Sequence, residues 1–229
     1  MQPYARRLLC MTCLLLALCA LPASRAVLPA AGRAAQEETY VYIELNRMRL
    51  TVYKNGQSAG VFPIAAGARD TPSPIGTFTV NRKFRTEMSG FGTRFLGLNV
   101  PWGQYGIHGT NRPDSLGQNA SHGCIRLSVR DAEQVYRLVP AGTRVTLDGG
   151  PFGPLGNGPV ALRPGDRSSQ VYEMQRRLIL RGALWGEADG VYGANTSRAV
   201  VRVRREMGMP PSDEADAAFL SALGVIAFE

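Results

Sequence analysis

The short stretch from Ser121 to Leu127 holds the residue types that a nucleophilic enzyme needs. Cys124 is the one cysteine outside the apolar N-terminal segment, and both histidines of the chain are close to it in sequence. His122 stands two residues before the cysteine, and His108 stands sixteen residues before it. Because a thiol with an imidazole within hydrogen-bond reach forms an activated nucleophile, these residues predict a cysteine nucleophile with a histidine base.

His108 is the better candidate for the base. A free thiol is mostly protonated at neutral pH and needs a base or a cation nearby. Gly123 predicts a sharp turn before Cys124, and His108, from a separate segment, can approach the sulfur from outside that turn. The same turn can aim the backbone N–H groups of Gly123 and Cys124 at one point, as an oxyanion hole. Asp114 or a backbone carbonyl could orient the imidazole, and Arg126 could bind a substrate carboxylate or form a plain surface salt bridge.

Two other interpretations of these residues stay open at this point. His108, His122 and Cys124 could be three ligands of a zinc ion, with water in the fourth place. Alternatively, Cys124 could be a buried structural cysteine beside two incidental histidines. The spacing by itself favours the nucleophile without excluding either of these.

The composition places the chain among ordinary globular proteins. It has 229 residues, of which 45% are hydrophobic and 19% charged, and a formal net charge of +8. Arg6, Arg7 and Arg25 belong to the expected leader, which has no acidic residue, so the rest of the chain carries +5. This modest charge fits a solvated surface or attraction to an anionic polymer. No dense Lys/Arg run with interleaved aromatic residues occurs, which argues against a nucleic-acid partner.

The first residues predict a secretory signal sequence at 1–26. A positive region and an apolar stretch are followed by small residues before a cleavage point after Ala26. The apolar stretch is too short to predict a membrane span. Lipidation at Cys19 is an alternative that the preceding leucine disfavours. Residues 27–38 predict a disordered tether, and the mature chain, with one thiol, can form no internal disulfide.

The segment 39–148 predicts a domain of many short strands and one helix. Strands are expected at 40–45, 48–52, 61–65, 77–80, 105–108 and 142–147. The Asn-Gly pair at 55–56 is the clearest turn between them. Residues 81–92 are polar and irregular, so they predict a loop or flap near the site. Residues 128–131 have the form of a capping box, which predicts the helix.

The remaining chain predicts a linker and a second, helical domain. Five glycines and three prolines stand within 149–159, which is typical of a linker. Apolar residues at helical spacing predict three helices in 160–226. Their expected first or capping residues are Ser168 or Ser169, Asn195 or Thr196, and Ser212 or Asp213.

Two stretches of the chain resemble the catalytic signature of the L,D-transpeptidase (YkuD-type) family. They are Ile107-His108-Gly109-Thr110 and Ser121-His122-Gly123-Cys124-Ile125-Arg126-Leu127. The resemblance extends to Thr71-Pro72-Ser73-Pro74-Ile75-Gly76-Thr77-Phe78 and to Pro140-Ala141-Gly142-Thr143-Arg144-Val145. The C-terminal part is similar to three-helix peptidoglycan-binding domains through Leu162-Arg163-Pro164-Gly165-Asp166, Gln175 and Asp189-Gly190-Val191-Tyr192-Gly193. Val203-Arg204 departs from the Phe-Gln often found in such domains.

The resemblance implies a fold and a role for each site residue. The fold would be a mostly β sandwich followed by the small all-α domain. His108 would be the general base, oriented by the backbone carbonyl of Gly109, and Gly123 would form the oxyanion hole with the N–H of Cys124. Supporting or substrate-binding positions would be His122, Ser121 and Arg126. The family implies no metal and no cofactor.

The implied reaction takes place on peptidoglycan stem peptides. Cys124 would attack the carbonyl at the L-centre of the third residue and expel D-alanine, leaving a thioester. The amine of a second stem peptide would resolve the thioester into a 3→3 cross-link, or a lysine would attach a protein to the wall. Carbapenems are expected to acylate the same cysteine.

Two competing functions are kept. An L,D-carboxypeptidase, which is a hydrolase, would resolve the same thioester with water. A wall-binding scaffold with a silent catalytic domain would need no intact cysteine. Under each of them the expected place is the periplasm or cell envelope, with peptidoglycan as the partner.

Overall fold

The computed structural model describes residues 38–87, 90–149 and 160–225. The expected signal sequence (1–26), tether (27–38) and linker (149–159) therefore lie outside the described residues, apart from Glu38 and Gly149. Within the described ranges, no helix has the length and apolar character needed to cross a membrane.

The first described part consists mainly of strands. In chain order they are β1 (Thr39–Glu44), β2 (Arg49–Lys54), β3 (Gln57–Pro63), β4 (Ala66–Gly67), β5 (Gly76–Arg85), β6 (Arg94–Leu98), β7 (Tyr105–Thr110), β8 (Asn119–Ser121), β9 (Ile125–Ser128) and β10 (Arg144–Asp148). The helical elements are η1 (Leu45–Arg47), η2 (Pro113–Ser115) and α1 (Val129–Leu138). This confirms the expected mostly β class.

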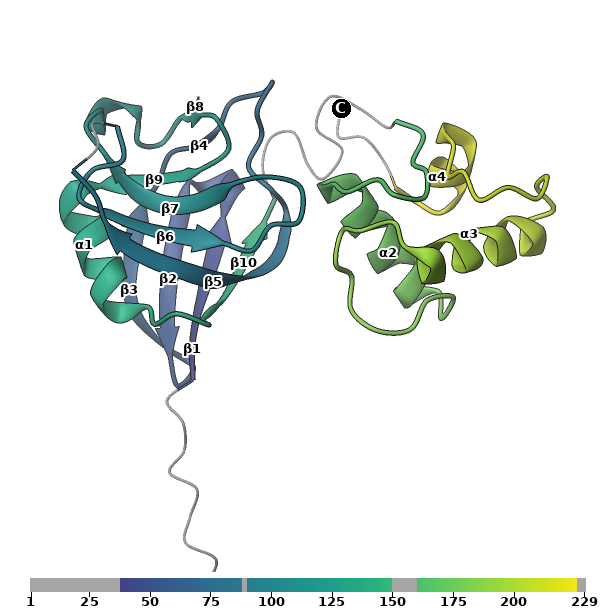
Figure 1. The fold of residues 1–229 in the computed structure, drawn as a ribbon, viewed down its shortest axis with the longest axis horizontal. Helices are drawn as coiled ribbons and strands as arrows, with labels where there is room; N and C mark the ends of the chain where they lie inside the picture. The colour runs from purple at the N-terminus through teal and green to yellow at the C-terminus, as the bar shows by residue number, and fades with distance from the viewer. Residues whose placement is uncertain (1–37, 88–89, 150–159, 226–229) are drawn as a thin grey trace, which may run out of the picture. The chain divides into compact units, whose positions relative to one another are not determined.

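Eight of these strands form one folded sheet. Their order is β3-β2-β1-β10-β5-β6-β7-β9, and β4 pairs with β8 in a separate short ladder. Figure 1 shows β5, β6 and β7 crossing in front of β1, β2 and β3, and β5 links the two layers because it pairs with both β10 and β6. Side chains that alternate along the strands fill the space between the layers, namely Val41, Ile43, Leu50, Val52, Leu96, Ile107, Ile125 and Leu127.

The structure has the turn and the helix cap that the sequence predicted. Asn55 and Gly56 both have positive φ, as a two-residue turn between β2 and β3 requires. Ser128 caps α1, because its hydroxyl accepts a hydrogen bond from the N–H of Asp131. The helix packs against β6, β7 and β9 through its buried Ala132 and Val135.

The expected loop at 81–92 is wrong in its first part. Strand β5 continues to Arg85, and β6, which the sequence pattern did not predict, pairs with it. The polar residues that suggested a loop belong to a strand with an exposed outer face, as at Asn81 and Arg82. A register shift between Val80 and Arg82 also breaks the alternation that would have identified the strand.

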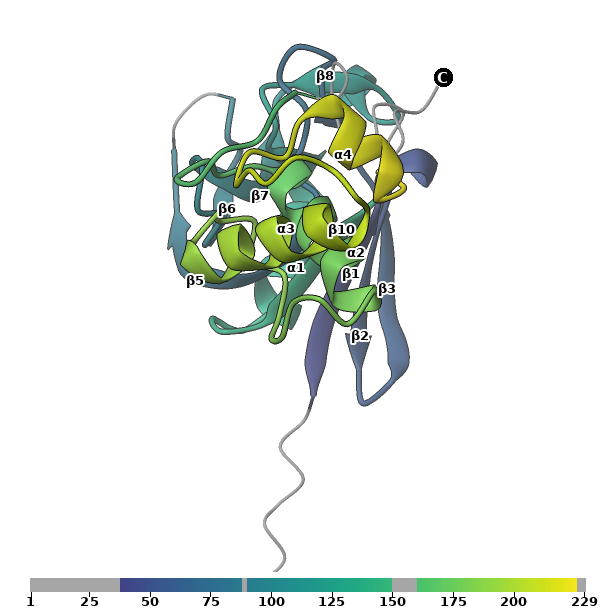
Figure 2. The ribbon, with the colours of Figure 1, turned by 90° about the vertical axis from the view of Figure 1, so that its right-hand side faces the viewer.

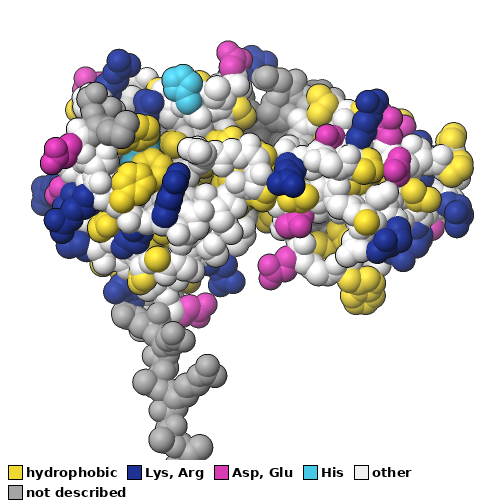
Figure 3. Space-filling model, in the orientation of Figure 1, with side chains coloured by type: hydrophobic (Ala, Val, Ile, Leu, Met, Phe, Trp, Pro, Cys, Tyr) yellow, Lys and Arg dark blue, Asp and Glu magenta, His cyan; other side chains and the backbone are white. Residues whose placement is uncertain are grey.

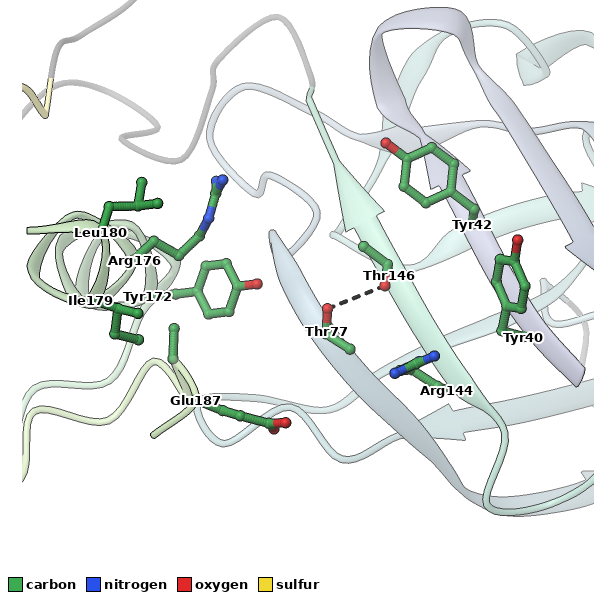
Figure 4. Close-up of a pocket in the computed structure, with 11 residues that line it drawn as sticks. Tyr40, Tyr42, Thr77, Arg144, Thr146, Tyr172, Arg176, Ile179, Leu180 and Glu187 are labelled. Carbon is green, nitrogen blue, oxygen red and sulfur yellow. Dashed lines mark hydrogen bonds between the residues drawn. The ribbon is translucent and has the colours of Figure 1, made fainter. Parts of the chain in front are cut away.

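The outer face of the sheet carries polar and aromatic side chains. Tyr40 pairs with Arg144, and Tyr42 pairs with Thr146, across the parallel strands β1 and β10. The hydroxyl of Thr146 lies 3.1 Å from that of Thr77 on β5, as Figure 4 shows. This face is therefore solvated, which explains the alternation of apolar and polar residues along β1 and β10.

The second described part contains three helices, α2 (Ser169–Leu180), α3 (Ala194–Glu206) and α4 (Ala217–Ala222), which are coloured green to yellow in Figure 2. The apolar residues expected to point inward are buried, namely Val171, Met174, Leu178, Ala199, Val200, Val203, Phe219, Leu220 and Leu223. Two expected helix starts are wrong. The N-cap of α3 is Gly193, without a side-chain cap, and the N-cap of α4 is Asp216, whose carboxylate accepts from the N–H of Phe219.

Gln175 links α2 to the loop before α3. Its amide nitrogen donates to Asp189 Oδ1, to the carbonyl of Val191 and to the hydroxyl of Thr196. Its amide oxygen accepts from the N–H groups of Asp189 and Gly190. Since the side chain is 3% exposed, every one of these bonds replaces a bond to water.

Replacing Gln175 with leucine is expected to lower the free energy of unfolding of this part by about 3 kcal/mol. The change removes the acceptor of two backbone N–H groups, and the one at Gly190 is then buried without a partner. Thermal unfolding of the full chain, followed in the transition of the helical part, measures the effect. A loss below about 0.5 kcal/mol, which is the range of surface changes, would contradict the role given to this network.

Candidate functional site

Two neighbouring strands position the residues that could do chemistry. Strand β7 pairs in parallel with β9, with His108 opposite Arg126 and Ile107 opposite Ile125. One further step along this register places Cys124 beside Gly106. Because paired residues of parallel strands point to the same face, the imidazole and the guanidinium lie on one side of the sheet. The structure therefore brings together the segments that hold His108, Cys124 and Arg126.

The imidazole of His108 is held by the backbone that follows it. The ring is 2% exposed, and Nδ1 lies 2.6 Å from the carbonyl oxygen of Gly109. A carbonyl can only accept a hydrogen bond, so Nδ1 carries the proton and Nε2 is left as the basic nitrogen. Burial lowers the pKa of His108 below its ordinary value, and the charge of Arg126 lowers the pKa further, while the bond to Gly109 opposes both.

Cys124 is a partly buried free thiol. Burial raises the pKa of Cys124, while a hydrogen bond to the backbone of Gly106 and the charge of Arg126 lower the pKa in part. A raised thiol pKa and a lowered imidazole pKa both favour the neutral forms. The thiol and the imidazole are therefore both favoured in their neutral forms, which suits proton transfer at the moment of attack rather than a preformed thiolate.

The turn before Cys124 requires a glycine. Gly123 has φ +102°, a conformation that side chains disfavour. A Cβ at this position would also come within 2.6 Å of the Tyr105 ring. The N–H of Gly123 donates to the hydroxyl of Ser121 at 3.0 Å, and this hydroxyl donates to the carbonyl of Cys124 at 2.6 Å. Ser121, which is 2% exposed, therefore fixes the turn, and the amide of Gly123 already has an acceptor.

Two residues of the site were not identified from the sequence. Tyr105 packs on Gly123, and burial raises the pKa of Tyr105, as does the Cys124 thiolate that forms at high pH. Gly106 lies beside the cysteine, and a Cβ there would come within 2.4 Å of the Phe95 ring. Both belong to the same strand as His108, in the run Tyr105-Gly106-Ile107-His108. Their position close to His108 in the sequence is the one feature that could have identified them as residues of the site.

Arg126 has an unused donor. Its Nη1 donates to the carbonyl of Ala120 at 3.1 Å, and its backbone exchanges two hydrogen bonds with Ala65. Its Nε is buried without a hydrogen-bond partner among the described residues. A buried donor without an acceptor is unfavourable, so the Nε–H of Arg126 is available to donate to a ligand oxygen without giving up an existing bond.

The other sequence candidates lie apart from this arrangement. His122 is exposed, although it neighbours Gly123 in sequence. Asp114 is exposed in η2, where its backbone carbonyl accepts from Gln118, so it is not seen to orient His108. The part of the chain that the structure describes holds no group of three His, Cys, Asp or Glu residues placed to bind a metal ion.

Aromatic rings enclose His108. The ring of Phe95 stacks on the imidazole with centroids 5.6 Å apart, and Phe91 meets it edge-on at 4.8 Å. In Figure 3, a group of hydrophobic side chains lies on this side of the β-rich part, with Lys and Arg side chains around it. Phe91 belongs to the connection between β5 and β6, so this segment supplies part of the burial that lowers the pKa of His108.

Replacing Phe91 with alanine is therefore expected to raise the pKa of His108 toward its ordinary value. NMR titration of the histidine C–H resonances measures the pKa, and His122→Gln assigns the second histidine. Phe84→Ala is the matched control, because Phe84 stacks on Phe95 at 5.0 Å and is 40% exposed. An unchanged pKa in Phe91→Ala, or an equal rise in the control, would contradict this assignment.

Comparison with known proteins extends these observations. Residues 38–147 match the family described as "L,D-transpeptidase catalytic domain", and residues 167–223 match the family described as "Putative peptidoglycan binding domain". The protein "Putative L,D-transpeptidase YkuD" of Bacillus subtilis (strain 168) is 36% identical over 109 residues, which are 48% of this chain and 65% of that protein. "Putative L,D-transpeptidase YqjB" of the same strain is 31% identical over 125 residues, which are 48% of this chain and 71% of that protein.

A solved structure also aligns with part of the chain. The crystal structure of an L,D-transpeptidase from Mycobacterium tuberculosis H37Rv is 27% identical, with a TM-score of 0.44, over 49% of this chain and 58% of that chain. The chain thus spans just under two thirds of the length of YkuD and somewhat more of YqjB.

Proposed function

Since the chain belongs to the L,D-transpeptidase family, we propose that it is a peptidoglycan L,D-transpeptidase with Cys124 as its nucleophile. One observation carries the mechanism. The carbonyl of Gly109 holds Nδ1 of His108, so the basic Nε2 is left for the thiol of Cys124, which directly precedes the adjacent strand β9. This supports His108 as the base and Gly109 as its orienter without any carboxylate.

The reaction begins with two neutral groups. Nε2 of His108 takes the thiol proton while the sulfur of Cys124 attacks the carbonyl carbon of the third stem-peptide residue. The imidazolium then gives its proton to the departing amine, and D-alanine leaves a thioester behind. The amine of a second stem peptide attacks the thioester carbonyl while Nε2 takes its proton; the C–S bond then breaks, the sulfur regains this proton as the free thiol, and a 3→3 cross-link results. A lysine of an envelope protein is the alternative acceptor.

The developing oxyanion needs backbone donors. The N–H of Cys124 is the donor we assign first, because the N–H of Gly123 already donates to Ser121. A shift of the Ser121 hydroxyl would release the N–H of Gly123 as the second donor. Ser121 thus supports the site by shaping the turn, and His122 at the exposed rim is a candidate contact for the stem peptide.

Arg126 is assigned to the substrate. Its buried, unpartnered Nε is a charge-assisted donor next to the reacting groups. A carboxylate or carbonyl of the donor stem peptide would satisfy it. No step of this mechanism needs a metal or cofactor.

The wider assignments follow from the same proposal. Residues 39–148 would be the catalytic domain and 160–226 the peptidoglycan-binding domain, joined by the linker 149–159. A signal sequence at 1–26 would deliver the protein to the periplasm or cell envelope. Wall binding would raise the local concentration of the polymer at the catalytic domain. Carbapenems would acylate Cys124 as substrate analogues.

Incubation with a purified disaccharide-tetrapeptide tests the proposed reaction. A cross-linked dimer that has lost one D-alanine, seen by mass spectrometry, is the expected product. A disaccharide-tripeptide alone would replace the transpeptidase with an L,D-carboxypeptidase, since water would then resolve the thioester. Neither product, from a folded protein, would favour the non-catalytic wall-binding scaffold.

A further inference from the structure

The loop between α2 and α3 presents a tryptophan to solvent. The side chain of Trp185 is 86% exposed, whereas its neighbours Ala183 and Leu184 are buried. The backbone here is anchored, because the N–H groups of Ala183 and Leu184 both donate to the carbonyl of Leu178. The indole is therefore held outward by a fixed loop. Such exposure leaves a large apolar surface in water. Exposed aromatic side chains of this kind are common among residues that contact a ligand.

A groove lies beside this indole. It encloses about 330 Å³, and its walls are Ala183, Leu184, Trp185, Asn195, Arg198, Ala199 and Arg202. This volume falls within the range of about 300–1,000 Å³ that is usual for sites of small ligands. Its lining combines apolar side chains with two arginines and the amide of Asn195. The groove therefore suits a ligand that has both the face of a ring and an anionic group.

The two arginines of the groove stand one turn apart on α3. Arg198 donates to the side chain of Asn195, and Arg202 donates to the carbonyl of Ala183. Arg202 also lies 4.0 Å from Glu206, at the limit of an ion pair. Two like charges at this spacing disfavour the helix slightly. Their guanidinium groups are well placed for a carboxylate, which Arg binds with two parallel hydrogen bonds.

We propose that this groove is where the helical part binds peptidoglycan, with a sugar ring on the indole of Trp185 and a stem-peptide carboxylate on Arg198 and Arg202. The occupant is a muropeptide unit of the wall, which has both features in one molecule. The match of residues 167–223 to a peptidoglycan-binding family names no site, and this groove supplies one. The inference rests on the proposed function only for the identity of the polymer.

Binding of the full mature chain to insoluble peptidoglycan tests the groove. Cosedimentation is measured in a Cys124→Ala background, so that the polymer is not consumed. Trp185→Ala and the double variant Arg198→Gln with Arg202→Gln are each expected to weaken binding by about tenfold or more. Trp185→Phe, which keeps an aromatic face, should retain part of the affinity.

Matched controls lie in the same helical part. Leu180→Ala removes another exposed apolar side chain, which is 79% exposed, and Arg167→Gln removes another exposed charge. Both should bind as the parent does. Wild-type binding by Trp185→Ala, or equal losses in the controls, would overturn the groove as the site.

The nature of the ligand is tested with two fragments. A soluble disaccharide-tetrapeptide should shift the emission of Trp185, measured in a Trp102→Phe variant, since these are the two tryptophans of the chain. Glycan strands without stem peptides should bind more weakly than the muropeptide, and equal binding would remove the carboxylate from the proposal. Carbapenem acylation of Cys124 in the Trp185 variants should be unchanged. Absence of acylation in the parent as well would refute the proposed reaction while leaving the groove standing.

Discussion

Replacing Cys124 with alanine is expected to abolish product formation from the disaccharide-tetrapeptide, with a loss on the order of 10⁵-fold. In the proposed mechanism the thiol forms the covalent bond on which the reaction depends, and Cys124 is the one free cysteine among the described residues. Mass spectrometry of the products over several hours measures the residual rate.

The fold of this variant should remain intact, because Cys124 is only partly buried and alanine is a smaller residue. Thermal unfolding of Cys124→Ala beside the parent is the control. Product formation near the parental rate, in a folded variant, would show that another group is the nucleophile.

Replacing His108 with glutamine is expected to slow acylation of Cys124 by about 10²–10⁴-fold. The glutamine keeps a polar group of similar length, but it cannot take the thiol proton. Stopped-flow acylation by a carbapenem measures the rate. His122→Gln is the matched control, since His122 is exposed and we expect little change there. Equal losses in the two variants would contradict the choice of His108 as base.

The same measurement in the parent protein has a defined pH dependence. Protonated imidazole cannot act as a base, so the acylation rate should fall as the pH drops through the pKa of His108. Burial and Arg126 lower this pKa, so the fall should occur below about pH 6.5, the ordinary value for histidine. The enzyme should therefore keep its rate in mildly acidic solution. A midpoint above that value would contradict the buried, neutral imidazole.

The parts of the site that were predictable from sequence are local. Gly123 directly precedes Cys124, and its positive φ follows from the turn that a glycine permits. The bond from His108 to the carbonyl of Gly109 joins adjacent residues, so a resemblance in the motif was enough to anticipate it. The buried residues of the strands and helices were predictable for a similar reason, because the spacing of apolar residues along the chain indicates which face of an element is apolar.

The parts that were missed depend on contacts between distant segments. Phe91 reaches His108 from the connection between β5 and β6, and no local pattern records that approach. The hydroxyl of Ser121 accepts a hydrogen bond from the N–H of Gly123, whereas the motif predicted this N–H only as a donor to the oxyanion. The start of α4 was misplaced because three residues with capping side chains, Ser212, Asp213 and Asp216, stand close together, and only tertiary packing selects the last.

The most direct test of the account is to trap the acyl-enzyme. The parent protein and Cys124→Ala are mixed with the disaccharide-tetrapeptide, quenched in acid and measured by intact mass, and the adduct is located by peptide mapping. The account predicts that the parent gains the mass of the donor less one D-alanine, on the peptide that holds Cys124, and that the variant gains nothing. An adduct at another residue, or the same adduct in Cys124→Ala, would contradict the thioester mechanism.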